Sequence, residues 1–146
     1  WYTRVMQQLT TEAIINEPVE KVWQYYTEPA HITKWAFADD SWHAPKAEND
    51  LRVGGRFVTR MEAKDGSAGF DFGGTYDEVV PNKKIAYTMD FKNGETPRKA
   101  VIEFQELGNS THVKVSFDPE NENSHELQVT GWQGILNNFK AHVEGN

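Results

Sequence analysis

The hydrophobic pattern near the C-terminus predicts one long helix over residues 124–146. Apolar side chains recur there at the i, i+3, i+4, i+7 and i+11 spacing of a buried helical stripe. The stripe consists of Trp132, Ile135, Leu136, Phe139 and Val143. We expect Asn123 to cap the start of this helix, with Glu126 reaching back to it as in a capping box.

A small and polar flank lies beside this stripe, formed by Gly131, Gly134 and Asn138. A glycine inside a helix costs about 1 kcal/mol relative to alanine, so two of them in one helix require a reason. A lone helix wrapped by a curved sheet, with part of its surface left unfilled, makes a container. The pattern is therefore interpreted as one wall of a small-molecule pocket.

The N-terminal third predicts one strand and two short helices. The first strand is expected over residues 5–15, because the segment ends in alternating and continuous apolar residues. A helix should follow from Pro18, since proline in a first turn lacks only an N–H that would be unpaired anyway. Pro29 should start a second short helix that carries Ile32 and Trp35.

From Asp39 onward the hydrophobic period changes to two, which is typical of strands. Turn signals separate the strands at Asp65-Gly66, Pro81-Asn82, Asn93-Gly94 and Gly108-Asn109. The residues expected to share inward faces are Phe57, Thr59 and Met61, then Phe70, Phe72 and Tyr76, then Ile85, Tyr87, Met89 and Phe91, then Val113, Val115 and Phe117. Strands joined by short turns pair antiparallel. The prediction is an α+β fold with a twisted antiparallel sheet of six or seven strands around the terminal helix.

Composition narrows the class of protein. A chain of 146 residues is expected to form a single domain over residues 1–146, large enough to bury a core. The net charge of −7 argues against a nucleic-acid partner, which requires clustered Lys and Arg. The chain has no cysteine, which excludes disulfides and suits a reducing compartment. Without an apolar run near the roughly 18 residues of a membrane span, and without a visible secretory signal, we expect a cytoplasmic protein.

Several short motifs occur in a fixed order along the chain. They are Glu12-Ala13-Ile14-Ile15-Asn16, Pro18-Val19-Glu20-Lys21-Val22-Trp23, Thr33-Lys34-Trp35, Gly54-Gly55-Arg56-Phe57, Gly74-Thr75-Tyr76-Asp77-Glu78-Val79-Val80-Pro81 and Gly131-Trp132. Over about residues 9–144 their order and spacing resemble the helix-grip, START-like (SRPBCC) superfamily, which includes the pollen allergen Bet v 1 and bacterial polyketide cyclases. Within it, the resemblance is greatest to bacterial homologues of the C-terminal domain of the Hsp90 ATPase activator.

The resemblance implies a helix-grip fold, in which a sheet grips the terminal helix around an elongated hydrophobic cavity. The ligand class follows only loosely, because relatives bind lipids, hormones, flavonoids and polyketides, or serve chaperones. A fold does not determine a function.

The candidate ligand-binding residues are mainly aromatic strand residues and the small flank of the terminal helix. They are Trp35, Phe57, Met61, Phe70, Phe72, Tyr76, Tyr87, Met89, Gly131, Gly134, Ile135 and Asn138. Tyr76, Tyr87 and Asn138 are the candidates for polar contacts that orient an apolar ligand, and Trp35 is the candidate lid at the rim. The alternative is that these side chains pack solid against the helix as ordinary core.

Candidate chemistry is sparse, and no catalytic residue, metal site or cofactor is assigned. His43 with Asp39 and Asp40 imitates a metal site, but two adjacent carboxylates rarely converge on one ion. Asp71 is expected to face solvent, because it alternates with inward phenylalanines. The direction of Glu103 is left open, and an inward carboxylate there would be a candidate base.

Three functions remain open at this level. The preferred one is noncatalytic binding of a small hydrophobic molecule. The second is an enzyme of the cyclase or aromatase type that uses the cavity as a template. The third is a protein-interaction module resembling a chaperone activator, with an exposed apolar patch that includes Trp1, Tyr2 and Phe91. An exposed Trp1-Tyr2 end would also support a homodimer.

Departures from the usual family pattern raise the hypothesis of an engineered binding variant. Gly134 and Ala68 are smaller than the residues usual at their positions, the chain starts with Trp1-Tyr2 rather than methionine, and the segment 91–97 is long for a hairpin. Ordinary sequence drift and a trimmed chain are the alternative explanation.

Overall fold

The computed structural model describes residues 8–146. Trp1, Tyr2 and the first residues of the expected N-terminal strand lie outside the described residues. The elements, in chain order, are β1 (Leu9–Ile15), α1 (Val19–Thr27), α2 (Pro29–Trp35), β2 (Trp42–Asn49), β3 (Arg56–Ala63), β4 (Gly69–Val80), β5 (Lys84–Met89), β6 (Lys99–Glu106), β7 (Thr111–Phe117) and α3 (His125–Glu144). This order confirms the predicted α+β class and helix-grip architecture.

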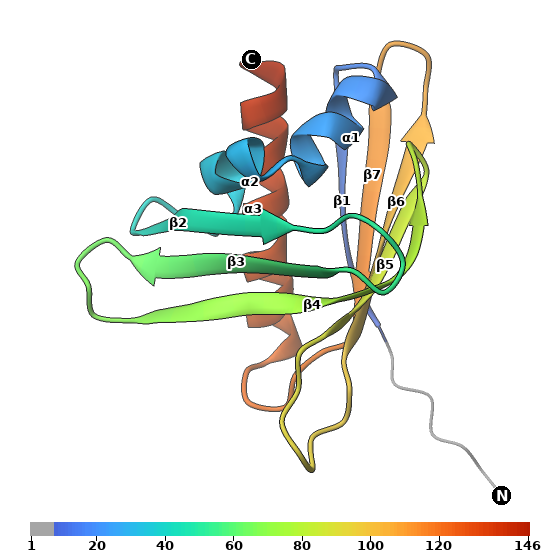
Figure 1. The fold of residues 1–146 in the computed structure, drawn as a ribbon. Coiled ribbons are helices and arrows are strands. Elements are labelled where there is room, and N and C mark those ends of the chain that lie inside the picture. Colours follow the sequence, from blue (N-terminus) through green and yellow to red (C-terminus); the bar gives the residue numbers. More distant parts are fainter. Residues whose placement is uncertain (1–7) are drawn as a thin grey trace, which may run out of the picture.

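The strands described form a seven-stranded sheet in the order β1-β7-β6-β5-β4-β3-β2. Every neighbouring pair is antiparallel, as the short connecting turns predict. The sheet is strongly curved, so that β2, β3 and β4 run across α3, whereas β1 runs beside it (Figure 1). Register shifts between Tyr76 and Glu78 and between His43 and Lys46 mark bulges, which increase local bending and twist.

Helix starts differ from the sequence prediction in two places. Ser124, not Asn123, caps α3, and its hydroxyl accepts a hydrogen bond from the Leu127 N–H at 3.1 Å. Asn123 instead donates both its backbone and its side-chain N–H to Glu120 Oε1, each at 2.7 Å. Pro18 is the residue before the first turn of α1 rather than a residue within it.

The core lies between the concave face of the sheet and the three helices. The strand alternation predicted this face correctly, and the largest fully buried side chains include Phe117, Phe139, Ile15, Ile85 and Ile102. Asp71 is exposed, as expected, and so is Glu103. Phe91 was expected to continue β5, but it lies beyond the strand end and is 54% exposed.

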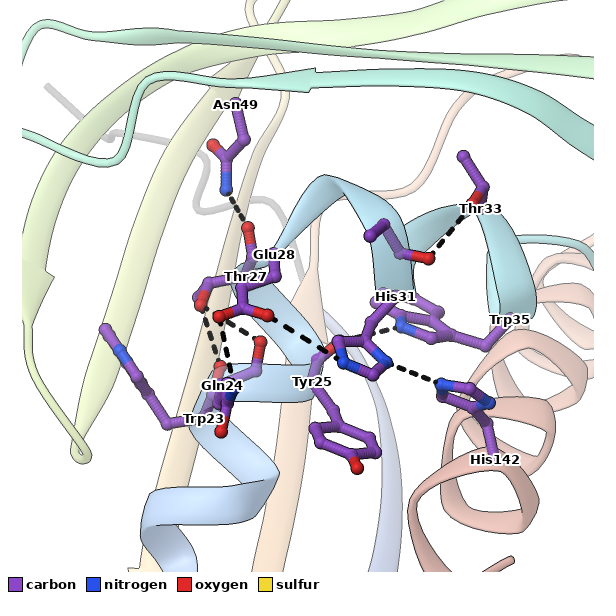
Figure 2. Close-up of polar contacts among 11 residues, drawn as sticks. Trp23, Gln24, Tyr25, Thr27, Glu28, His31, Thr33, Trp35, Asn49 and His142 are labelled. Carbon is purple, nitrogen blue, oxygen red and sulfur yellow. Dashed lines mark hydrogen bonds and ion pairs between the residues drawn. The ribbon is translucent and has the colours of Figure 1, made fainter. Parts of the chain in front are cut away.

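Helices α1 and α2 are fixed to their surroundings by a few polar contacts, shown in Figure 2. The Trp35 indole N–H donates to the Tyr25 carbonyl at 2.9 Å. The His31 ring lies on α2 and its Nδ1 is 2.9 Å from His142 Nε2 of α3.

Across residues 8–146, no helix combines the length and the apolarity that a bilayer crossing needs.

Candidate functional site

A cavity of about 490 Å³ lies between the concave sheet, α3 and the segment that joins α2 to β2. Small-molecule sites in proteins typically measure about 300–1,000 Å³ and are mostly apolar. Strands β3, β4 and β5 line one side of the cavity with the inward residues of their alternating pattern, and α3 lines the other. The volume and the apolar wall suit a small organic molecule.

Ten of the twelve candidate residues line this cavity. They are Trp35, Phe57, Met61, Phe70, Phe72, Tyr76, Tyr87, Met89, Gly131 and Ile135. Several of them are also buried core residues. The same side chains therefore fit both interpretations, a ligand-binding pocket and a packed core. Binding of a ligand by this set stays a prediction.

Gly134 and Asn138 have a different role from the expected one. A Cβ atom on Gly134 would lie 2.7 Å from the Ala38 carbonyl oxygen, which is closer than real Cβ contacts. The Asn138 side-chain N–H donates to the Phe37 carbonyl at 2.6 Å. Both residues therefore hold the α2–β2 connection against α3. Gly134 thus serves close packing and lends no weight to the idea of an enlarged, engineered cavity.

Gly131 has different surroundings from Gly134. It lines the cavity, and a Cβ atom built on it would meet no atom within 4 Å other than those of its chain neighbours and of its own helix backbone. The side chain that is missing at this position would therefore point into open space.

Aromatic rings build the sheet side of the cavity. The Phe57 ring lies 4.7 Å from that of Tyr87 and 5.8 Å from that of Phe72, measured between ring centroids. Gly74 stands opposite Phe57 in register, and a Cβ atom there would lie 3.0 Å from the Phe57 ring. The glycine therefore lets this ring lie close to the sheet.

Trp35 is a fixed part of the wall. Its side chain is only 6% exposed, and its indole nitrogen is occupied by the Tyr25 carbonyl. Its ring stacks on Tyr26 with centroids 5.0 Å apart and meets Phe139 edge to face at 4.9 Å. These contacts do not suit the expected lid.

Three tyrosines line the cavity and differ in their partners. The Tyr76 hydroxyl donates to Asn49 Oδ1 at 2.5 Å, and Asn49 in turn donates to the Thr27 carbonyl at 2.6 Å. Burial raises the pKa of Tyr26, Tyr76 and Tyr87 above the usual value for a phenol. All three are therefore neutral at ordinary pH, and they are poor bases for catalysis near neutrality.

Charged and polar side chains also line the cavity. They include Arg98, Glu120 and the buried Gln128, whose amide bonds to the backbone of the β7–α3 connection. Trp42, another lining residue, meets Phe70 edge to face, with ring centroids 5.9 Å apart.

The candidate metal-binding residues Asp39 and His43 contact other protein groups. Asp39 accepts hydrogen bonds from the Ser41 N–H at 2.8 Å and from its hydroxyl, which lower the pKa of Asp39. The His43 Nε2 faces Glu62 Oε1 at 3.8 Å. Across residues 8–146, no group of three His, Asp or Glu side chains is placed to hold a metal ion.

Sequence reasoning missed several lining residues, among them Tyr26, Trp132, Trp42 and Arg98. Trp132 was assigned to the buried stripe of the terminal helix, and it lies flat against Phe117 at a centroid distance of 4.1 Å. A signal existed for this residue, because it follows the cavity glycine Gly131 directly. Tyr26 shares a face of α1 with core residues, and only the docking of α1 places it at the cavity.

Comparison with known proteins agrees with the fold. The family model described as Activator of Hsp90 ATPase homolog 1-like protein matches residues 16–144. The AHSA1-like protein from Aeromonas hydrophila, solved by NMR, is 40% identical with a TM-score of 0.85, over 95% of this chain and 93% of that one. Chr148 from Cytophaga hutchinsonii is 50% identical with a TM-score of 0.78, over 95% of this chain and 93% of its own.

More distant structures share the fold alone. CalU16 from Micromonospora echinospora is 16% identical with a TM-score of 0.69, over 97% of this chain and 85% of its own. Among curated proteins, none matches the chain. The family model covers most of the chain and the identities to two solved structures are high, so the chain belongs to the family of Activator of Hsp90 ATPase homolog 1-like proteins.

Proposed function

We propose that the protein binds a small hydrophobic molecule in the cavity between the sheet and α3, without catalysing a reaction on it. The observation that carries this proposal is Gly131. A mid-helix glycine costs about 1 kcal/mol relative to alanine, and no atom lies close enough to this position to require it. Open space beside an aromatic wall is what a ligand needs and what a packed core avoids.

A catalytic role has less support. Among the described lining residues, the ionisable groups are three phenols together with Asp39, Arg98 and Glu120. Asp39 accepts from Ser41, and Arg98 donates to the Asp118 carbonyl. A cyclase that relies on general acid–base chemistry needs a group that titrates near the working pH. The raised pKa of Tyr87 makes that phenol unsuitable as such a group.

The family description favours a second candidate, which is contact with a chaperone of the Hsp90 type. Among residues 8–146, the exposed large apolar residues that such a contact would use are Ile14, Val53, Phe70, Phe91, Leu107 and Leu127. They belong to separate segments of the chain, and singly exposed apolar residues are common on protein surfaces. Gel filtration of the protein mixed with Hsp90 tests this candidate, and co-elution would support it.

The preferred proposal is tested by titrating the protein with the neutral fluorescent probe N-phenyl-1-naphthylamine. We expect saturable binding by the wild type, and binding at least about tenfold weaker by Gly131→Leu, because leucine would occupy the open space. The matched control is Thr130→Leu, which adds the same side chain at an exposed position one residue away. Unchanged binding by a folded Gly131→Leu protein would refute the cavity as the site.

A further inference from the structure

The Tyr87 hydroxyl is a polar group in an otherwise apolar wall. Tyr87 lies on the inward face of β5, lines the cavity and is only 6% exposed. Among residues 8–146, no protein atom forms a hydrogen bond with its hydroxyl. Thr11 Oγ1 is a fully inaccessible polar atom without a hydrogen-bond partner in the described chain. The Tyr87 oxygen is not in that class, so it is accessible to open space. The Tyr87 hydroxyl therefore borders the cavity.

Tyr26 presents a second hydroxyl of the same kind. Its ring is held by stacking on Trp35 and by an edge contact with Phe139 at 5.1 Å. Within the described part of the chain its hydroxyl likewise has no hydrogen-bond partner. Tyr87 stands opposite Tyr76 in register on the neighbouring strand, and Tyr26 lines the same cavity from α1.

Tyr76 provides the contrast within the same cavity. Its hydroxyl already donates a hydrogen bond to Asn49, and Asn49 in turn donates to the Thr27 carbonyl at the end of α1. Tyr76 therefore serves the structure, whereas Tyr26 and Tyr87 each keep a donor to offer.

We propose that the ligand is a neutral apolar molecule with a hydrogen-bond-accepting oxygen, most simply a ketone carbonyl, to which the Tyr87 and Tyr26 hydroxyls donate. The inference rests on the proposed function and names the ligand class of that same cavity. A pure hydrocarbon in the cavity would leave the buried Tyr87 phenol and the part-buried Tyr26 phenol unpaired, which is unfavourable. A carbonyl oxygen has two lone pairs and can accept from both hydroxyls.

The charge of the site also favours a neutral ligand. Neutral phenols donate to an acceptor without requiring it to be charged, and burial in an apolar wall disfavours an ionised group. Arg98 is the basic side chain among the described lining residues, and its charge acts on Tyr87 against the larger effect of burial. Its Nε donates to the Asp118 carbonyl at 3.3 Å, and the carboxylate of Glu120 lines the same cavity.

The test uses two probes of the same shape, 2-acetylnaphthalene and 2-isopropenylnaphthalene, which differ by an oxygen in place of a CH₂ group. The readout is the ratio of their dissociation constants in each protein, which cancels a variant's general effect on the fold. We expect Tyr87→Phe to reduce the preference for the ketone by about tenfold and Tyr26→Phe to reduce it in the same direction. Tyr25→Phe is the matched control, because it removes the hydroxyl of a tyrosine that does not line the cavity, and it should leave the ratio unchanged.

A second measurement covers the case in which one variant fails to fold. The carbonyl stretching frequency of bound ¹³C=O-labelled 2-acetylnaphthalene should be lowered in the wild type and should rise in whichever tyrosine variant is stable. If both probes bind and neither the ratio nor the frequency changes in either variant, the inference is wrong while the proposed function stands. If neither probe binds the wild type, both the proposed function and this inference are wrong.

Discussion

Gly131 and Gly134 lie one turn apart on α3, yet their surroundings are opposite. A Cβ atom on Gly131 would meet open space, whereas one on Gly134 would collide with the backbone of the α2–β2 connection at Ala38. The first glycine preserves an empty volume and the second permits a close approach. A glycine in a helix is therefore no indication of a cavity until its neighbours are known.

The two positions are nevertheless connected. Gly134 and Asn138 bring residues 37–38 against α3, and this connection forms part of the cavity wall beside Gly131. Close packing on one turn of the helix thus helps to close the open space on the preceding turn. The predictions below separate these two roles.

The largest effect is expected from Gly134→Leu. The new side chain cannot be accommodated without moving the Ala38 backbone, so we expect a loss of about 3 kcal/mol in the free energy of unfolding. Urea denaturation followed by circular dichroism measures this loss. A variant as stable as the wild type would show that the helix and the connection do not pack closely at this point.

Asn138→Ala should destabilise the same contact by a smaller amount. It removes the donor to the Phe37 carbonyl, and leaving a part-buried carbonyl unpaired costs about 1–2 kcal/mol. The control is Asn137→Ala on the exposed neighbouring position, where we expect a change below about 0.5 kcal/mol. Equal losses from the two alanine variants in urea denaturation would contradict the role given to Asn138.

The fold was largely predictable from the sequence, because its signals are local. The period of two, the turn at Asn93-Gly94 and the apolar stripe that ends at Val143 all specify elements without reference to distant residues. The cap of α3 was mispredicted because Asn123 and Ser124 both have capping side chains. The choice between them depends on the tertiary position of Glu120.

The site was predictable only where it follows strand alternation. Inward parity places Phe57 and Tyr87 in the wall once the sheet is known to curve around the helix. The role of Gly134 depends on a segment almost one hundred residues earlier in the chain, which no local pattern reports. For the same reason the sequence did not predict that Tyr26 lines the cavity, because this depends on where α1 packs.

Gly131→Ala should have the opposite sign from Gly134→Ala. At Gly131 the methyl group meets no neighbour, so the helix gains up to about 1 kcal/mol of stability. At Gly134 the same methyl group would lie 2.7 Å from a backbone oxygen, so the clash should outweigh the gain. Thermal and urea unfolding of the two alanine variants give the comparison directly. A change of the same sign in both would contradict the distinction between the two glycines.

The smallest effect concerns a polar contact between α2 and α3, which His31 and His142 make at 2.9 Å. Partial burial lowers the pKa of His142, and the charges of His31 and Lys34 act in the same direction. Glu28 faces the His31 Nε2 at 3.8 Å, and Tyr25 stacks on the His31 ring. Because the folded state holds His142 neutral, the unfolded state binds more protons just below the ordinary histidine pKa of about 6.5.

The contribution of His142 to stability should therefore be present above about pH 6.5 and be lost as the pH falls through its lowered folded pKa. Urea denaturation at a series of pH values between about 7.5 and 5 should show a steeper decline for the wild type than for His142→Gln. The effect is small because the ring is only part-buried. Parallel pH profiles for the two proteins would show that protonation of the histidine pair does not weaken the contact of α2 with α3. The Trp35–Phe139 contact would then hold α2 in place, and Gly134 and Asn138 would hold residues 37–38.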